Sequence, residues 1–487
     1  MVLIGIVLAA GYAVWLLTQN DWRRAVYWLL LYMPYVGVLT LAMYPAPPVT
    51  RVVKDVVFIV PIYLGLATET IRRRTATPIS LWIKIAMAVT TVVVIVQAFN
   101  SEMHDTVVAL VGIKTWIFYY PLLFAGRALV RRREDLVRVF LWMGFAGLLP
   151  LGIGLAQALL LYTGHGDIAY APYGEAAAAA VTQAFSGAEF SRGVQMTKTP
   201  GIFTFVTQYY NFTLAMVAIG FAIGFGGGKR QRVWLAVMGF AALAGMLSGA
   251  RGAFVMVPLM LLAAGLMAEG LKRLPHAIAV ATAAVALMLL ITRAPPEELS
   301  EMVKTISINY AVEVPMEQLS IAGSEGLWGH GTGVSTGAAG AMVENRADYS
   351  GAPLWILAAE MYFAKALVEL GVIGLISIAF LLVSVLFGGW RALRQLRDRE
   401  LKGYGAAIFS FLVIGALNEW KGPYLDLDPL NVYFWLWAGI LLSLPELEGA
   451  GARIASATKV RAATTWRPGV IGGPERLPAV PALRSRL

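Results

Sequence analysis

The feature that most constrains this chain is a series of apolar runs, separated by polar connections. A helix needs roughly 20 mostly apolar residues to cross a hydrocarbon core of about 30 Å. Thirteen runs of this kind can be marked, the first at 2–18 and the last at 430–446. Only 14% of the 487 residues are charged, whereas soluble domains contain about 25%. The sequence therefore predicts an all-α, polytopic membrane bundle of about 13 transmembrane helices (roughly 12–14).

Basic residues are concentrated in alternate connections between these runs. They form the groups Arg23-Arg24, Arg72–Arg74, Arg127–Arg138, Lys229–Arg232, Lys272-Arg273 and Arg391–Lys402. Because cytoplasmic connections of membrane proteins carry the excess of Lys and Arg, this alternation predicts an outside N-terminus and a cytoplasmic C-terminus. The net charge of +10 would suggest nucleic-acid binding in a soluble protein, but the placement of the basic residues indicates orientation in a membrane instead. We expect no nucleic-acid partner.

The long connections set the expected organisation of the chain. No internal repeat of roughly 20–50 residues is visible, so we treat 1–447 as a single transmembrane domain. Two outward loops, about 163–200 and 293–353, are too long to be simple connectors, and loops above about 12–15 residues are usually functional or disordered. We expect chemistry at this outward surface. Short helical pieces are expected at 297–306, and a semi-polar helix at 354–368.

The C-terminal segment 448–487 has a different composition from the rest of the chain. It is rich in Pro, Ala and Arg and lacks apolar periodicity. This pattern predicts a disordered, basic, cytoplasmic tail. Its arginines are expected to rest on anionic lipid head groups, where each basic residue gains attraction to the membrane surface.

Arg251 is the first candidate site residue. It lies within Ser248–Ala253, a short turn between two apolar runs that the charge alternation places outside. An arginine so close to hydrocarbon normally faces a polar cavity or a partner, and its guanidinium can bind phosphate oxygens in a bidentate manner. The alternative is an arginine that extends to the membrane interface without binding a ligand.

Arg192 and Lys198 form the second candidate. They lie at the end of the first long loop, just before Pro200 and Gly201, which we expect to open a helix. Free backbone amides at a helix start favour anions. The sequence therefore predicts an anion-binding segment where the loop meets the membrane, although basic residues of a long loop can also be simply solvated.

The third candidate is the segment 359–371. Lys365 and Glu369 are four residues apart on a predicted helix, so we expect them to form an ion pair. Glu360 is nine residues before Glu369 and therefore on the opposite face. A carboxylate without a partner beside the membrane is a candidate general base. Tyr362 and Lys365 are expected to contact substrate beside it.

Other polar residues give weaker signals. Lys114 lies within an apolar run, where it faces either the bundle interior or the interface. The string Gly329–Gly333 is similar to a phosphate-binding loop but lacks the usual ending, and we count its His330 as a candidate substrate contact or an ordinary loop residue. Asp426 and Asp428 are typical of an acidic turn. With four histidines and no cysteine, we expect no metal site and no other cofactor.

In this order the elements resemble the O-antigen ligase and polymerase superfamily. The matching segments are Arg192–Phe203, the turn Ser248–Ala253, the Gly-rich stretch near Leu327–Gly333, and the string Leu367–Gly374. The last string is the most specific of them. The resemblance covers about residues 107–390.

The resemblance implies a bacterial inner-membrane glycosyltransferase with a GT-C-like fold. Such enzymes take glycan from an undecaprenyl diphosphate carrier at the periplasmic face and transfer it to an acceptor, and Arg192 and Arg251 match the family's diphosphate-binding arginines. Ligases of the family usually carry a histidine nine residues before the Glu-x-Gly, where this chain has Glu360. This departure favours a polymerase of O-antigen or exopolysaccharide units over a ligase. Chain-length regulators and export proteins are the expected protein partners.

The expected reaction is a metal-independent, inverting displacement. Two arginines can stabilise the charge that develops on a leaving diphosphate, and a carboxylate can accept the proton of the acceptor hydroxyl. No second nucleophilic carboxylate is evident, so we expect no covalent intermediate. The alternative of another class is a flippase or transporter, for which charges near the midplane of broken helices are typical. A non-catalytic scaffold of an export complex is the third alternative.

Overall fold

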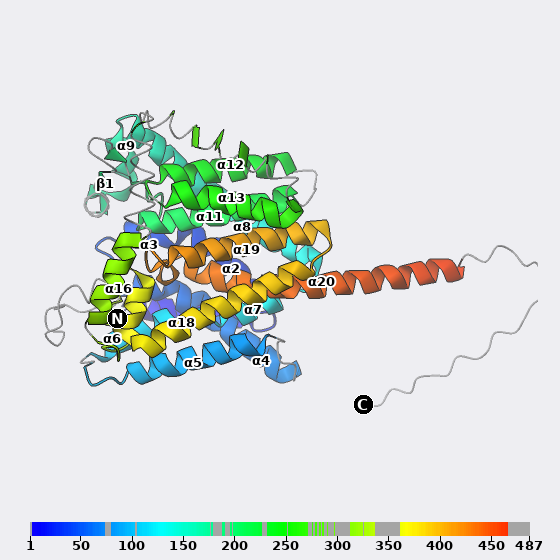
Figure 1. Ribbon diagram of the computed structural model, residues 1–487, viewed down its shortest axis with the longest axis horizontal. Coiled ribbons are helices and arrows are strands. Elements are labelled where there is room, and N and C mark those ends of the chain that lie inside the picture. The colour runs from blue at the N-terminus through cyan, green and yellow to red at the C-terminus, as the bar shows by residue number, and fades with distance from the viewer. Residues whose placement is uncertain are drawn as a thin grey trace, which may run out of the picture.

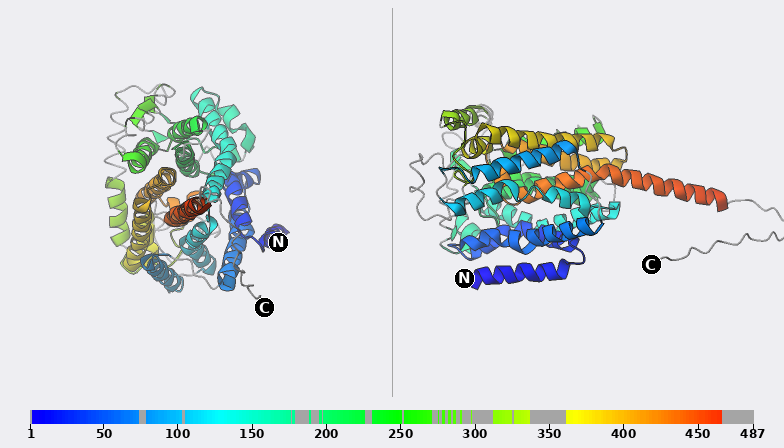
Figure 2. Two further views of the ribbon diagram at one scale, coloured as in Figure 1. Left: turned by 90° about the vertical axis from the view of Figure 1, so that its right-hand side faces the viewer. Right: turned by 90° about the horizontal axis from the view of Figure 1, so that it is seen from below.

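The computed structural model describes residues 2–73, 79–102, 105–175, 177–178, 188–189, 195–196, 198–225, 231–250, 252–270, 312–324, 326–336 and 361–465, together with scattered residues between 275 and 297. Within these ranges the chain forms an elongated bundle of roughly aligned helices (Figure 1). Seen along the helix axes, α20 lies near the middle of the bundle, and α1 lies at its edge (Figure 2).

The elements follow one another as a nearly all-helical chain. The first part contains α1 (Val2–Thr18), α2 (Arg23–Tyr32), η1 (Met33–Tyr35), α3 (Val36–Ala42), η2 (Pro48–Val52), η3 (Asp55–Ile59), α4 (Val60–Arg73), α5 (Leu81–Gln97), α6 (Thr106–Ile117), α7 (Leu122–Leu129), α8 (Arg133–Tyr162), α9 (Gly166–Tyr170) and η4 (Ala171–Tyr173). The second part contains β1 (Ala188–Glu189), β2 (Gln195–Met196), α11 (Val206–Phe225), α12 (Gln231–Leu247), α13 (Ala253–Glu269), α16 (Val314–Ser324), α18 (Tyr362–Gln395), α19 (Arg399–Asn418), η9 (Tyr424–Asp426) and α20 (Leu430–Thr465). The two short strands pair antiparallel, with Ala188 opposite Met196.

Seven helices in the described part of the chain are long and apolar enough to cross a membrane. They are Arg23–Ala42, Thr106–Leu129, Arg133–Tyr162, Val206–Phe225, Tyr362–Gln395, Arg399–Asn418 and Leu430–Gly449. The helices α1, α5, α12 and α13 are shorter but also apolar. The prediction of an all-helical membrane protein is thus confirmed in its coarse form. The count of about thirteen spans stays a prediction, because the expected run at 275–292 falls mostly outside the described residues.

Ion pairs connect the basic connections to one another at one end of the bundle. These pairs are Arg23–Glu69, Arg131–Glu69, Arg133–Asp398, Arg399–Glu269 and Arg127–Glu446. Their residues belong to α2, α4, α7, the α7–α8 connection, the start of α8, α13, the α18–α19 connection, the start of α19, and α20. The described basic connections thus lie at one end of the bundle, and the side of the membrane that this end faces stays a prediction. We call this the basic end, and we call the opposite end, where α9, β1 and α16 lie, the loop end (Figure 1).

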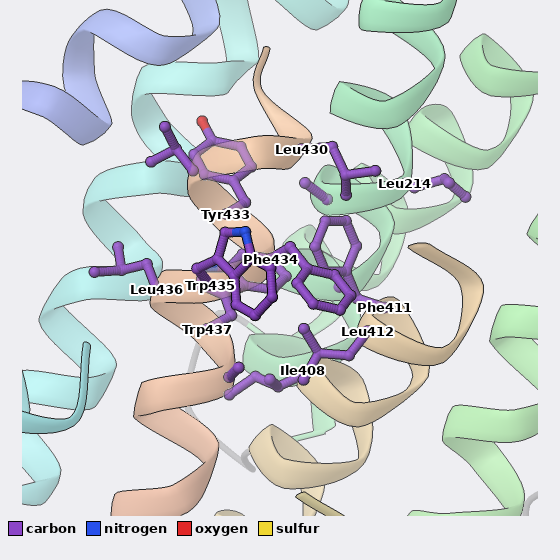
Figure 3. Packing of buried hydrophobic residues seen from close by; sticks show 14 of the residues in the cluster. Leu214, Ile408, Phe411, Leu412, Leu430, Tyr433, Phe434, Trp435, Leu436 and Trp437 are labelled. Atoms are coloured by element: carbon purple, nitrogen blue, oxygen red, sulfur yellow. The ribbon is translucent and has the colours of Figure 1, made fainter. Parts of the chain in front are cut away.

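Aromatic side chains fill the core between α11, α19 and α20 (Figure 3). The rings of Phe411 and Trp437 have centroids 4.6 Å apart. Tyr433 and Trp437 lie one helical turn apart on α20 and are nearly parallel, with 8° between their planes. Leu214 of α11 packs in the same cluster (Figure 3). Large rings at this position fix α20 in the middle of the bundle, because aromatic side chains bury the most surface per residue.

Glycines allow α7 and α20 to approach more closely than other residues would permit. A Cβ added to Gly126 would lie 1.9 Å from the Leu436 carbonyl oxygen. A Cβ added to Gly439 would lie 2.0 Å from the Leu123 carbonyl oxygen. Small residues at helix contacts let backbones pack directly against each other within a membrane. We infer that this contact fixes the position of α20 beside α7.

Two helices differ from the sequence-based expectation. The helix α18 breaks at Gly371, where φ is 69° and ψ is −172°. A half-helix therefore precedes the apolar span, as predicted. It begins at Tyr362, and residues 351–360 lie outside the described part of the chain. The helix α20 continues to Thr465 and projects beyond the basic end (Figure 1). A disordered tail was expected from 448; alanine-rich sequence with its high helix propensity explains the extension. Residues 466–487 lie outside the described part.

The long second loop contains one described helix. The helix α16, Val314–Ser324, lies across the loop end rather than along the bundle (Figure 1). It packs against the first half of α18 through Ala322 and Val368. Helical structure in this loop was predicted, but at 297–306, of which only Glu297 is described.

Candidate functional site

The three predicted catalytic residues lie outside the described part of the chain, but their neighbours in sequence are described. Arg192 belongs to the connection between β1 and β2. Arg251 directly precedes Gly252, which begins the approach to α13. Glu360 directly precedes Met361, the residue before α18. The placement of these flanking residues shows which segments meet at the loop end.

The two arginine-bearing segments are joined by a backbone hydrogen bond. The Thr199 amide donates to the Ser248 carbonyl oxygen at 2.8 Å, and both residues are fully buried. Lys198, a predicted substrate contact, lies next to this bond, and its carbonyl oxygen accepts from the Tyr170 hydroxyl at 3.3 Å. The segment after Arg192 therefore packs directly on the turn that contains Arg251.

The same turn also lies against α11 and the connection that follows α19. A Cβ on Gly252 would stand 3.9 Å from the Tyr210 hydroxyl and 4.0 Å from Lys421 Nζ. Tyr210 in turn lies 3.5 Å from the side-chain oxygen of Asn418, the last residue of α19. The connection between α19 and α20 is thus the third element at this place, and it carries several acidic residues.

The predicted anion site at the start of the helix after residue 200 is not formed as expected. The helix α11 begins at Val206 rather than at Gly201. The Gly201 amide donates to Gln157 Oε1 at 2.9 Å. The amides of residues 204 and 205 donate to Gln208 Oε1 at 3.1 and 3.2 Å. Side-chain amides therefore satisfy the donors that the sequence suggested were free for an anion.

The expected ion pair between Lys365 and Glu369 is wrong. Lys365 binds Asp426 Oδ2 at 2.5 Å, and its ammonium lies 4.4 Å from the centre of the Trp116 ring. The indole N–H of Trp116 donates to Glu369 at 2.6 Å. One tryptophan from α6 therefore separates the two charges. Tyr362 packs on the same ring at 5.0 Å between centroids and is buried.

The carboxylate of Glu369 is bound by the glycine-rich loop. It accepts from the amide of Gly333 at 2.8 Å, from the amide of Ser335 at 3.0 Å, and from the hydroxyl of Thr336 at 2.9 Å. Residues 329–333 are similar in sequence to a phosphate-binding loop, and in the structure this loop does bind an anion. That anion is the protein's own carboxylate, so these donors are not available to a phosphate.

Three glycines make this arrangement possible. A Cβ on Gly329 would lie 2.5 Å from the Gly371 amide nitrogen, and a Cβ on Gly333 would lie 2.3 Å from the Val108 carbonyl oxygen. Both glycines and Gly371 have positive φ, between 69° and 103°. Only glycine adopts such a conformation without steric cost. The two strings that carried much of the family resemblance are therefore packed against each other.

His330 and Lys114 have protein partners. His330 Nδ1 lies 2.6 Å from Glu102 Oε2, which ties the glycine-rich loop to the segment after α5. Lys114 Nζ lies 2.7 Å from Asp55 Oδ2. Of the two alternatives for Lys114, the structure supports a side chain that faces the protein. Asp55 also binds Lys54 at 3.1 Å, so two lysines share one carboxylate.

The sequence analysis did not single out Lys54 and Glu419. Lys54 is 3% exposed and binds Asp428 at 3.2 Å as well as the Tyr119 hydroxyl at 2.7 Å. Asp428 was interpreted as an ordinary turn residue. The one available signal was a charged residue at the edge of an apolar run, which is costly unless it is paired.

Glu419 and Asp426 are buried acids in the connection between α19 and α20. Glu419 Oε1 accepts from the Leu425 amide at 2.9 Å, whereas Oε2 has no hydrogen-bond partner among the described residues. Asp426 binds Lys365 through Oδ2 only. Burial raises the pKa of Asp426 even though Lys365 opposes the shift. Burial, with Asp426 nearby, raises the pKa of Glu419 well above its usual range.

The loop end thus brings together buried acids with raised pKa values, buried ammonium groups and the flanks of both predicted arginines. The residues that the structure describes contain no group of three or more His, Asp or Glu side chains that could hold a metal ion. No protein-family model matches this chain, and no curated protein is significantly similar to it. The residues at the loop end therefore carry the functional conclusion.

Proposed function

We propose that this chain is a membrane glycosyltransferase that polymerises glycan units carried on undecaprenyl diphosphate, with its site at the loop end. The observation that supports the proposal best is the hydrogen bond from Thr199 to Ser248, at 2.8 Å. It joins the segment that follows Arg192 to the turn in which Arg251 stands. A lipid diphosphate carries several negative charges close together, and a pair of converging arginine segments is suited to bind it.

The proposed chemistry is a direct displacement at the anomeric carbon. The acceptor oxygen forms a bond to that carbon while the bond to the diphosphate oxygen breaks and its electrons leave with the diphosphate. Arg192 and Arg251 stabilise the developing charge, and Glu360 accepts the proton of the acceptor hydroxyl. Direct displacement inverts the anomeric configuration, and the two arginines replace a metal ion in this scheme.

The acceptor distinguishes a polymerase from a ligase. We favour the polymerase because Glu360 stands where ligases of the resembling superfamily usually have histidine. A deletion strain tests this choice through its lipid-linked glycans. Loss of a polymerase leaves single repeat units on the lipid, whereas loss of a ligase leaves long lipid-linked polymer. Normal lipid-linked glycans in the deletion strain would contradict both.

Arg251 is the residue whose replacement tests the site. Arg251→Ala should abolish most polymer formation by the purified protein in nanodiscs, because diphosphate contacts in a low-dielectric site contribute strongly to the transition state. Arg251→Lys should restore activity only in part, since an ammonium lacks the bidentate geometry. The matched control is Arg399→Ala at the basic end, where the guanidinium pairs with Glu269. Near-normal polymer formation by Arg251→Ala would contradict the proposal.

Glu360→Gln tests the proposed base. The amide keeps the size of the side chain but cannot accept a proton, so turnover should fall by roughly 10²–10⁴-fold. Binding of the lipid-linked donor should persist, because the arginine segments are unchanged. Glu446→Gln, at the basic end, is the control with the same substitution. Unchanged turnover of the Glu360→Gln variant would remove Glu360 from the mechanism.

A further inference from the structure

The connection between α19 and α20 lies between the two segments that flank the proposed catalytic residues. On one side Lys421 Nζ lies 4.0 Å from the Cβ position of residue 252, the neighbour of Arg251. On the other side Asp426 binds Lys365, in the half-helix that follows Glu360. The ring of Trp420 in this connection also lies 6.2 Å from that of Phe363 in the same half-helix. A movement of the connection would therefore be transmitted to both segments.

The two buried acids of this connection, Glu419 and Asp426, have few partners for their carboxylate oxygens. Glu419 is fully buried, and the described cation that contacts the acid pair is Lys365, through Asp426. One oxygen of each acid, Glu419 Oε2 and Asp426 Oδ1, has no hydrogen-bond partner among the described residues. A buried carboxylate without a partner is costly, and it usually takes up a proton instead. In the described part of the chain Lys365 contacts only Asp426 of the two acids, so the two orphaned oxygens favour a proton on one of them.

The groups that face this acid pair come from α18 and from the connection itself. They are Lys365, Tyr362 and Glu369 of α18 and the backbone amides of Tyr424 and Leu425. Glu369 has four donors of its own. The third acid of the connection, Asp428, is paired with Lys54 at 3.2 Å. The contacts with these neighbours leave Glu419 Oε2 and Asp426 Oδ1 without a hydrogen bond among the described residues.

We infer that Glu419 and Asp426 together bind one exchangeable proton in the resting protein, and that this proton holds the connection in the position that the transfer reaction requires. Only the claim that the proton positions the connection for the transfer reaction rests on the proposed function. When the proton leaves, two adjacent carboxylates repel each other beside a single ammonium. The connection then shifts away from residue 252 and from the half-helix of α18, and the site loses its alignment. Glu419 is a positioning residue in this scheme.

The raised pKa of Glu419 sets the direction of the pH dependence. A group whose pKa is higher in the folded protein stabilises it at low pH, and this stability is lost as pH rises through the folded-state pKa. Activity and stability of the wild type should therefore both decline on the alkaline side. Glutamine resembles the protonated acid in size and charge, so Glu419→Gln should keep its activity at neutral pH and lose that alkaline decline.

Infrared spectroscopy of the protein in nanodiscs detects the proton without reference to activity. The wild type at neutral pH should show the C=O band of a buried carboxylic acid, sensitive to D₂O exchange, and Glu419→Gln should lack it. Asp426→Asn should lack it as well, because Glu419 then ionises beside Lys365. This second variant keeps the test decisive if the first does not fold. The control is Glu446→Gln, whose spectrum should match the wild type. A band that persists in both variants overturns the inference.

The activity measurement separates positioning from direct proton transfer. Polymer ladders should be formed across a pH series by the wild type and by Glu419→Gln, with the variant extending to higher pH. A Glu419→Gln variant that is inactive at every pH, or one with an unchanged alkaline limb, contradicts the positioning role. If no purified preparation forms polymer, the proposed function fails, while the infrared bands still decide whether the proton is bound.

Discussion

The two ends of this bundle use carboxylates in opposite ways. At the basic end the carboxylates of Asp398, Glu269 and Glu446 each face an arginine, and the Glu446 side chain is 61% exposed. At the loop end Glu369 and Glu419 are fully buried. The first arrangement keeps charges near water, where pairing costs little. The second removes them from water and must satisfy each oxygen by other means.

Two aspartates show the difference most directly. Partial burial alone would raise the pKa of Asp398, but the Leu401 amide and the Arg133 guanidinium outweigh it and hold that pKa below the usual value. For Asp426 burial wins, and the pKa is raised although Lys365 is in contact. The comparison teaches that at the loop end an ion pair alone does not lower the pKa of a buried acid.

The largest test of the comparison concerns the side of the membrane that each end faces. A reporter fused after Arg397 should be active only in the cytoplasm, and one fused near Gly340 only in the periplasm, because basic connections are retained inside. Fusions at both sites can be compared in the same strain with reporters specific for each compartment. Both fusions on one side would refute the orientation, and with it an outward site.

Glu369→Ala should produce the largest loss of stability. It leaves four donors without an acceptor, among them the Trp116 indole and the Gly333 amide. A buried unsatisfied donor costs about 1–3 kcal/mol. Hydrogen exchange should show lost protection in residues 327–336, whereas Glu446→Ala at the basic end should leave that loop protected. Retained protection of the loop in Glu369→Ala would show that the carboxylate does not hold it.

Glu369→Gln is expected to share this defect in a milder form. The amide places an NH₂ group opposite two of the four donors, so two hydrogen bonds are lost. A helix-spacing argument from the sequence treats this variant as harmless, because it assigns Glu369 only an exposed pair with Lys365. A free energy of unfolding of Glu369→Gln equal to that of the wild type would favour an exposed pair of Glu369 with Lys365.

The sequence was informative where local patterns determine structure. Apolar runs predicted the helices, the alternation of basic residues predicted which connections share an end, and Ser248–Ala253 was correctly interpreted as a turn between helices. The network of Trp116, Lys365 and Glu369 could not be predicted, because α6 and α18 are far apart in the chain. Helical spacing predicts neighbours on one helix only. Glu419 was missed for the same reason, since two of its charged or polar neighbours, Lys365 and Tyr362, lie on α18.

After Glu369→Ala, Lys365→Met should cause the next largest loss of stability. It leaves Asp426 buried without its cation, and removing one partner of a buried pair typically costs about 3–5 kcal/mol. Asp426→Asn in the same chain should recover much of this loss, because no uncompensated charge remains. The free energy of unfolding in mixed micelles measures both. Additive losses in the double variant would indicate that the two side chains do not interact.

The smallest expected effect is at the basic end. In the wild type Asp398 pairs with Arg133 at 2.9 Å and caps α19 by accepting from the Leu401 amide. Asp398→Asn removes the charge but keeps a side chain that can cap the helix. Exposed pairs contribute about 0.2–1 kcal/mol, so the free energy of unfolding should fall by no more than that at neutral pH. The lowered pKa of Asp398 provides stability above the unfolded-state pKa of about 3.9, and this stability is lost as pH falls through the folded-state value. The difference between Asp398→Asn and wild type should therefore vanish in acid and shrink in high salt. A difference that instead grows toward alkaline pH, as expected of Glu419, would erase the contrast between the two ends.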